Sequence, residues 1–287
     1  MITKNILSLL RRLLAVCLAI ACLVLVSACR KNEETDAVRV IFFDVGQGNA
    51  ALIRTPDGDV LIDAGGEATE AFLCGRLREM GVDELALLIL TTSANESIGG
   101  ADGVLKEFGA RNVWYNGGFV ENESAERLGQ VLRESSVPWQ SVNDYSTFAL
   151  GGVRLSVLFP FAQEPADENI VVQLLYGSFS ALWMGYAAKE VESQLCATYR
   201  SSILQSDLLV VGRHGSNTLT GEAFLEALSP QYAVISCGAN NLYGYPTGEL
   251  LERLAASDVQ VLRTDRHGDI VFVDSGNGLC LPEEWEK

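Results

Sequence analysis

The sequence predicts an α/β fold built from two strand-rich halves with helices around them. Short runs rich in β-branched and aromatic residues, separated by glycine turns, follow residue 37. Similar runs fill the middle of the chain, and toward its end they alternate with segments of helical periodicity. The pattern fits two sheets packed face to face with helices outside, and it fits a single mixed sheet equally well.

The first half is expected to open with three strands and to continue as alternating helices and strands. The run ELALLILT is apolar almost throughout, which predicts a buried strand in the centre of its sheet. The expected strands are 38–45, 50–55, 59–64, 84–91 and 112–115, and the expected helices are 67–80, 98–108 and 124–135.

The second half is expected to begin with a group of strands and to end with strands and helices in alternation. Its expected strands are 147–150, 153–159, 170–176, 179–184, 207–211, 232–236, 259–264 and 269–273. Its expected helices are 189–204, 221–228 and 247–256.

The N-terminus has the layout of a secretory signal, with basic residues before an apolar stretch that is short for a membrane span. The string Val26-Ser27-Ala28-Cys29 resembles a bacterial lipobox, in which the chain is cut before the cysteine and its thiol is acylated. We expect a signal peptide at 1–28, a lipid on Cys29 within a tether at 29–37, and a folded domain at 38–287. The domain would then be lipid-anchored on the extracytoplasmic face of a bacterial cell membrane. The alternative is an uncleaved N-terminal anchor, which would also place the domain outside the cytoplasm.

The chain is strongly acidic, with 21 Lys and Arg against 37 Asp and Glu and a formal charge of −16. Loss of the expected signal removes Lys4, Arg11 and Arg12, which takes the charge from −16 to −19. Such a surface repels polyphosphate, so nucleic acid is not an expected partner. The cysteines beyond Cys29 are scattered without a CxxC, which favours small buried side chains over a disulfide framework or a metal site. They are Cys74, Cys196, Cys237 and Cys280.

Five motifs, found in a fixed order along the chain, narrow the choice of fold family. The chain carries FFDVGQGNAALIRTPDGDVLIDAGG (42–66), LLILTTSANESIGG (87–100), DLLVVGRHGSNT (207–218), YAVISCGANNLYGYPTGELLERL (232–254) and RTDRHGDI (263–270). Together they resemble the metallo-β-lactamase-fold domain at the C-terminus of the DNA-uptake competence protein ComEC. Several ordered matches are far more specific than one motif. The resemblance covers about residues 38–275 and implies an αββα metallo-β-lactamase-like sandwich, with its cleft at the loop ends of two sheets.

The same resemblance implies that the zinc ligands of the family are lost. In that family they come mainly from HxHxDH, a later Asp in TGD and a His of HHGS. The corresponding positions here hold Thr92, Ala94, Glu96, Ser97, Tyr186, Arg213 and His214. Catalytic zinc needs about three protein ligands and an open position for water. One carboxylate and one imidazole do not supply them, while the glycine and aspartate turns of the family persist.

We therefore expect no catalytic residue, no metal and no cofactor. We interpret the chain as a catalytically inactive lipoprotein that binds or scaffolds an unknown protein or small-molecule partner. One alternative is a metal-dependent hydrolase or nuclease that holds zinc at an atypical site with Glu96, Asp63 and His214. Another is an accessory of DNA uptake, although the charge argues against it and fold analogy does not carry function. Ser97 is expected to cap a helix that begins at Ile98 rather than to act as a nucleophile.

Overall fold

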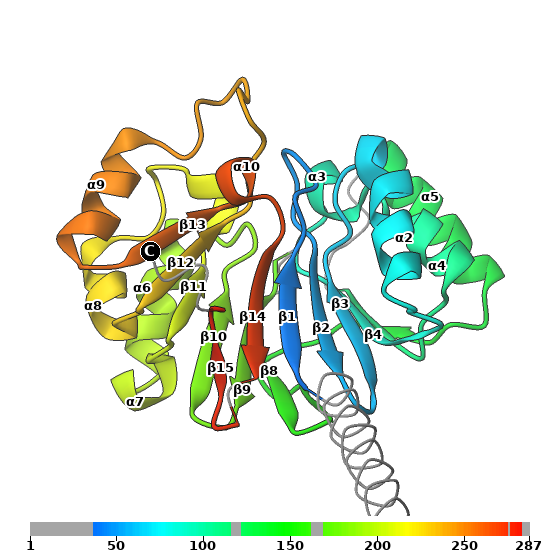
Figure 1. Cartoon of the computed structure of the whole chain (residues 1–287), viewed down its shortest axis with the longest axis horizontal. Coiled ribbons are helices and arrows are strands. Elements are labelled where there is room, and N and C mark those ends of the chain that lie inside the picture. Colours follow the sequence, from blue (N-terminus) through cyan, green and yellow to red (C-terminus); the bar gives the residue numbers. More distant parts are fainter. Residues whose placement is uncertain (1–36, 116–121, 162–168, 275, 283–287) are drawn as a thin grey trace, which may run out of the picture. The chain divides into compact units, whose positions relative to one another are not determined.

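Two β-sheets face each other, and helices cover the outer face of each sheet (Figure 1). The structure is a computed structural model that describes residues 37–115, 122–161, 169–274 and 276–282. Within these residues the first sheet has the strand order β15-β14-β1-β2-β3-β4-β5-β6, and the second has the order β13-β12-β11-β10-β9-β8-β7. The expected signal peptide and the lipidation position Cys29 lie outside the described residues.

The elements follow one another with short connections. The first sheet contains β1 (Arg39–Phe42), β2 (Ala51–Thr55), β3 (Gly58–Ile62), β4 (Leu85–Leu90), β5 (Val113–Tyr115), β6 (Trp139–Gln140), β14 (Ile270–Asp274) and β15 (Leu279–Cys280). The second contains β7 (Thr147–Leu150), β8 (Val153–Phe159), β9 (Val171–Tyr176), β10 (Phe179–Trp183), β11 (Leu208–Val210), β12 (Tyr232–Ile235) and β13 (Gln260–Arg263).

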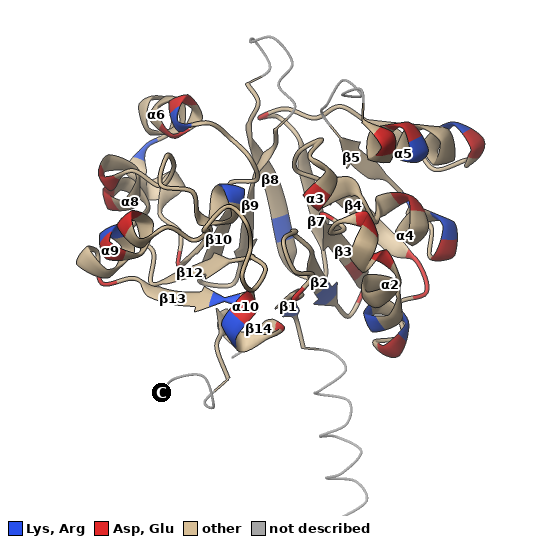
Figure 2. Cartoon of the chain, turned by 90° about the horizontal axis from the view of Figure 1, so that it is seen from above, with Lys and Arg blue, Asp and Glu red and all other residues tan. Residues whose placement is uncertain are grey.

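The helices belong to one sheet or the other by chain order. Beside the first sheet lie η1 (Glu67–Thr69), α2 (Glu70–Glu79), α3 (Asn95–Ile98), α4 (Ala101–Glu107) and α5 (Glu123–Glu134). Beside the second lie α6 (Lys189–Thr198), α7 (Ser201–Leu204), η2 (Gly212–Gly215), α8 (Glu222–Leu228), α9 (Gly248–Ala256) and α10 (Thr264–His267). The charged side chains gather mainly on these helices and only sparsely on the strands (Figure 2).

The core is divided into layers by the alternation of side chains along each strand. Val40 and Phe42 belong to the apolar cluster between the sheets, where the ring of Phe42 stacks on Trp183 with 5.8 Å between centroids. Ile41 and the neighbouring Phe43 belong to the cluster shared with α2, α4 and α5. A third cluster joins the second sheet to α6, α8 and α9. The four layers are helices, sheet, sheet and helices, which confirms the αββα fold class.

The predicted central strand at 84–91 is confirmed as β4, because all six of its residues are buried and it lies between β3 and β5. Three predicted helices differ from the expectation. The helix expected at 98–108 begins only at Ala101, as α4, because Ile98 ends the separate turn α3 before Gly99–Gly100. The helix expected at 189–204 divides into α6 and α7, and the one expected at 67–80 opens with the 3-10 turn η1. Among the described residues, no helix combines the length and apolar character needed to span a bilayer.

The two ends of the sandwich differ. β1 runs in the direction of β3 and β4, and β10, β11 and β12 are parallel to one another. The loops after these strands meet, because the backbone amide of Gly238, after β12, donates to Oε1 of Gln47, after β1 (2.9 Å). We name this end the loop end. β1 begins at Arg39, at the opposite end of the sandwich (Figure 1).

Candidate functional site

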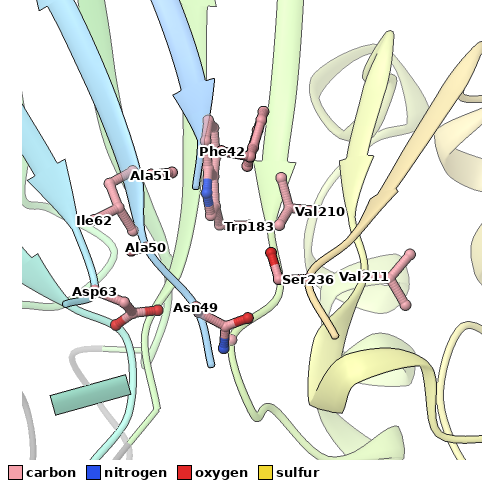
Figure 3. Close-up of a pocket in the computed structure, with 11 residues that line it drawn as sticks. Phe42, Asn49, Ala50, Ala51, Ile62, Asp63, Trp183, Val210, Val211 and Ser236 are labelled. Carbon is pink, nitrogen blue, oxygen red and sulfur yellow. The ribbon is translucent and has the colours of Figure 1, made fainter. Parts of the chain in front are cut away.

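The loop end gathers residues from both sheets around a small cavity. Asn49, Asp63 and Ser236 lie together beyond the strand ends, and Phe42 and Trp183 line the deeper part (Figure 3). The cavity has a volume of about 10 Å³, which is room for a single water molecule. The residues that the resemblance places at ligand positions lie in helix α3 and in the segments that follow β4, β10 and β11.

His214 is the one imidazole at this site, and both of its nitrogens are engaged. Its Nδ1 lies 2.8 Å from the backbone oxygen of Ser236, which can only accept, so Nδ1 carries the proton. Its Nε2 lies 2.5 Å from the hydroxyl of Tyr186. In the neutral ring Nε2 is the acceptor, and Tyr186 therefore donates to it. The nitrogen that a metal would use is occupied by a hydroxyl from the same chain.

Burial maintains the protonation states that this arrangement needs. Only 4% of the His214 surface is exposed, and this desolvation lowers the pKa of the imidazole, which keeps the ring neutral. Burial also raises the pKa of the Tyr186 hydroxyl, and the nearby Glu96 carboxylate raises it further. The phenol therefore stays a donor at neutral pH.

The backbone brings Tyr186 and His214 together. Arg213 and His214 both adopt left-handed conformations, with φ of 47° and 54°, which turns the chain sharply after β11. The amide of Arg213 donates to the oxygen of Gly185 (3.1 Å). The Arg213 guanidinium, through Nε, donates to the oxygen of Tyr186 (3.2 Å). These contacts fix the loop after β10 against the turn after β11, so the Tyr186–His214 pair is held from both sides.

The remaining ligand positions are poor metal donors. Thr92 is buried, and its hydroxyl accepts from the amide of Ala94 (3.4 Å). Ala94 has no donor atom, and the Ser97 hydroxyl accepts from Nδ2 of Asn49 (3.2 Å). The prediction that Ser97 caps a helix is wrong. Helix α3 begins earlier, at Asn95 with Ala94 as its cap, and Ser97 lies buried inside it.

Asp63 uses both of its carboxylate oxygens in hydrogen bonds within the fold. It follows β3 with φ of 58° and is fully enclosed. Its two carboxylate oxygens accept from the amide (2.8 Å) and the hydroxyl (2.7 Å) of Thr91, after β4. Burial raises the pKa of Asp63 to about 7, against the hydrogen bonds that lower it. The alternative set of Glu96, Asp63 and His214 is thus not assembled, and no three His, Cys, Asp or Glu side chains of the described residues are grouped to share an ion.

The four cysteines of the domain are free thiols. Cys74 and Cys237 are buried, and Cys196 and Cys280 are partly buried. This agrees with the expectation of small packing side chains. Burial raises the pKa of the Cys74 and Cys237 thiols to about 11, which keeps them protonated and unreactive.

Comparison with known proteins defines the class. Residues 43–239 match the metallo-beta-lactamase superfamily, and the chain belongs to this superfamily. It is 31% identical over 279 residues to ComE operon protein 3 of Bacillus subtilis (strain 168), an alignment that covers 90% of this chain and 35% of that protein. It is also 31% identical over 245 residues to competence protein ComA of Neisseria gonorrhoeae, covering 84% and 32%. The chain therefore spans about a third of the length of these curated relatives.

Solved structures share the fold. A diphosphatase from the PhnP family superposes with a TM-score of 0.51 and 15% identity, covering 85% of this chain and 100% of that one. The metallo-beta-lactamase fold protein YhfI from Bacillus subtilis gives a TM-score of 0.50 and 11% identity, covering 83% and 100%. At such identities the likeness shows the fold alone.

Sequence reasoning placed Tyr186 and His214 at two separate ligand positions and missed their hydrogen bond. The residues are 28 positions apart, and their contact depends on the parallel pairing of β10 with β11. A usable signal was present, since a tyrosine at an acidic ligand position beside a retained histidine supplies a donor for the free ring nitrogen.

Proposed function

We propose that this protein is a catalytically inactive metallo-β-lactamase-like binding module, anchored by a lipid on Cys29 to the extracytoplasmic face of the cell membrane. The observation that carries the loss of catalysis is the relay Tyr186–His214–Ser236, in which the hydroxyl donates to Nε2 and Nδ1 donates to a carbonyl. A domain of this superfamily that keeps its framework and fills its site with internal hydrogen bonds is suited to binding rather than to hydrolysis.

A zinc ion does not fit these residues. To reach Nε2 it would have to displace the Tyr186 hydroxyl from a buried hydrogen bond, which costs roughly 1–3 kcal/mol before any metal contact is made. Glu96 could then add one carboxylate, whereas Thr92, Ala94 and Ser97 offer neutral hydroxyls or nothing. The positive charge of Arg213, bonded to the Tyr186 carbonyl, further opposes a cation.

Metal content of the purified full-length chain in detergent tests the loss of the site. We expect substoichiometric zinc, manganese and iron, and no rise in melting temperature on adding zinc, since a ligand stabilises only by binding the native state. A variant with Thr92→His, Ala94→His, Glu96→Asp, Ser97→His, Tyr186→Asp and Arg213→His should bind zinc and melt at a higher temperature in its presence.

The matched control for that test is Tyr186→Phe, which frees Nε2 of His214 without adding a ligand and should remain free of metal. Only two histidines are present, so the ring resonances of His214 can be followed by NMR during a zinc titration. Near-stoichiometric zinc in the unmodified chain, lost in His214→Ala together with hydrolytic activity, would establish the metal-dependent hydrolase instead.

The anchor is tested separately. Cys29→Ala should abolish incorporation of labelled palmitate and either leave the signal uncleaved or release the domain, because the lipobox-like string ends at Cys29. Cys22→Ala, inside the expected signal, is the matched control and should leave labelling unchanged. Equal labelling of wild type and Cys29→Ala would rule out this anchor.

An accessory role in DNA uptake is a second candidate, favoured by the name of one curated relative, competence protein ComA of Neisseria gonorrhoeae. With a formal charge of −16 the chain would serve there through contact with another protein rather than by holding DNA. Deletion of the gene, followed by a transformation assay, tests this role, and unchanged uptake would remove it.

A further inference from the structure

A polar cavity lies on the outer face of the second sheet, at the end of the sandwich opposite the loop end. Its volume is about 550 Å³, which is typical of pockets that hold small molecules. It lies where β10 and β11 begin, and α7 and the end of α8 complete its wall. Figure 1 shows α7 at this end of the molecule. The cavity is separate from the site around His214, and the function proposed above does not use it.

Gln173, on β9, is a buried amide in the wall of this cavity. It is 5% exposed and faces away from the other sheet, because its neighbours Val172 and Leu174 belong to the cluster between the sheets. Its Nε2 donates to the carbonyl of Ile203 in α7 (2.6 Å), which fixes the orientation of the amide. Its Oε1 accepts no hydrogen bond from any residue that the structure describes. A buried acceptor is costly to leave unpaired, so this oxygen calls for a donor from a ligand.

Four serine hydroxyls of the lining have already used their hydrogens within the protein. Three donate to backbone carbonyls and one donates to the carboxylate of Asp207. A hydroxyl has one hydrogen and two lone pairs, so each of these can now only accept from a ligand. The exposed Ser202 and Gln205, at the rim, keep both abilities. The wall is therefore rich in acceptors and poor in donors. The four hydroxyls, with their donor–acceptor distances, belong to Ser178 (2.7 Å), Ser180 (3.0 Å), Ser206 (2.9 Å) and Ser229 (2.9 Å).

Asp207 adds a negative charge to these acceptors. It precedes β11 and is the one charged residue among the described residues that line the cavity. Its Oδ2 accepts from the amide (2.7 Å) and the hydroxyl (3.0 Å) of Ser180, whereas its Oδ1 accepts nothing and forms no ion pair within the described part of the chain. Hydrogen bonds in which both donor and acceptor are charged are the strongest, so a cationic donor suits this carboxylate best.

The rest of the wall is aliphatic, which narrows the kind of cation. Leu175 and Leu228 line the cavity, and Ile203, beside them, is 44% exposed. A hard metal ion needs six or so oxygens close around it, and a cavity of this size with leucine walls does not provide that shell. Methylene groups, in contrast, gain free energy by covering such side chains. An anion would place lone pairs against lone pairs, and a sugar would find few donors for its own oxygens.

We propose that this cavity binds an aliphatic amine in its protonated form, such as a diamine. An ammonium group lies against Asp207, N–H groups donate to Gln173 and the serine hydroxyls, and the alkyl stem packs on Leu175 and Leu228. The proposal goes beyond the inactive binding module, because it gives the domain a small-molecule site on residues that the superfamily resemblance does not assign.

Calorimetric titration of the full-length chain in detergent with putrescine tests the proposal. We expect saturable binding of one molecule per chain at physiological salt, where diffuse attraction to a chain of charge −16 is screened. Butanediol of the same chain length has no charge, and tetramethylammonium is charged but has no N–H. Each should bind at least about 10-fold more weakly, which is the loss of one hydrogen bond between charged groups.

Variants locate the binding. Asp207→Asn keeps an oxygen to accept from Ser180 but removes the charge, and it should weaken putrescine binding by about 10-fold. Asp57→Asn, at an exposed turn, is the charge-matched control and should leave the affinity unchanged. Ser202→Lys places an ammonium at the rim and should abolish binding, whereas Ser201→Lys, also exposed on α7 but outside the lining, should not. Melting temperatures equal to that of the wild type show that each variant is folded.

A further probe distinguishes the source of the amine. If lysine amide with an acetylated α-amino group binds more tightly than putrescine, the site receives a lysine side chain of another protein, and weaker binding assigns it to a free diamine. Three results would overturn the proposal: binding of Ca²⁺ in preference to putrescine, equal affinity in Asp207→Asn and Asp57→Asn, or equal loss in the two lysine variants. None of them depends on metal at His214 or lipid on Cys29, so failure here leaves the inactive module to be judged by its own tests.

Discussion

Burial favours the uncharged forms of His214, Tyr186 and Asp63. Desolvation lowers the pKa of His214 and raises those of Tyr186 and Asp63. A metal centre requires the reverse, with carboxylates ionised and imidazole nitrogens available to the ion. The loss of ligands and the gain of a closed hydrogen-bond network are therefore two aspects of one change at these positions.

Asp63 gives the stability of the protein a specific dependence on pH. Its pKa is about 7 in the folded chain against 3.8 for an ordinary aspartate, so the folded state holds a proton that the unfolded state has released across this window. The free energy of unfolding should fall as pH rises from about 4 to about 7, by up to about 4 kcal/mol. His214, whose pKa is lowered from 6.5, acts in the opposite sense, since its contribution is lost as pH falls.

The variant Asp63→Asn isolates that contribution. Asparagine tolerates the left-handed backbone and can keep both contacts with Thr91, accepting from the amide and donating to the hydroxyl. We expect the variant to be more stable than wild type at pH 8, with the advantage shrinking toward pH 5, as measured by urea unfolding. Asp57→Asn, at an exposed turn, is the control and should shift nothing. Parallel pH profiles for wild type and Asp63→Asn would exclude this role.

At the scale of elements, the junction between α3 and α4 depends on glycine because other backbone segments approach it closely. A Cβ on Gly99 would lie 2.4 Å from the amide nitrogen of Glu67 and 2.6 Å from the carbonyl oxygen of Asn95, whereas a Cβ on Gly75, inside α2, would meet nothing within 4 Å. Gly99→Ala should lower the free energy of unfolding by about 1–3 kcal/mol through overpacking. Gly75→Ala should raise it by roughly 0.5–1 kcal/mol. Thermal unfolding distinguishes them, and equal stability would contradict the crowding at Gly99.

Periodicity predicted the longer elements, because their alternation directly reflects which face is buried. Strand β4 and helix α5 lie within two residues of their predicted bounds. The two-residue strands β6 and β15 and the single turn α10 were missed, since elements this short have no period to detect. Side chains at the site were assigned from the family pattern, but their contacts depend on strand pairing between distant segments. For that reason the Ser97 cap was wrong and the Tyr186–His214 bond was not foreseen.

At the scale of the whole molecule, the two ends of the sandwich differ, because the residues of the candidate functional site gather at only one of them. The residues around His214 form a hydrogen-bonded network at the loop end, to which the segments after β10, β11 and β12 contribute. The sheets and helices that hold these loops are those of the superfamily framework, and they are retained here.

Net charge belongs to the whole molecule, and it bears on whether this chain could hold DNA directly. Nucleic-acid binding depends on releasing counterions from phosphates with Lys and Arg, and this chain has 21 of these against 37 acids, the acids lying largely on the outer helices (Figure 2). The full-length chain should therefore not retard duplex or single-stranded DNA at physiological salt. Lowering the salt should not produce binding either, because weaker screening strengthens the repulsion as well. A gel-shift series from low to physiological salt checks this, with a basic DNA-binding protein as positive control. Micromolar binding that weakens as salt rises would reveal a basic groove and make DNA a direct ligand.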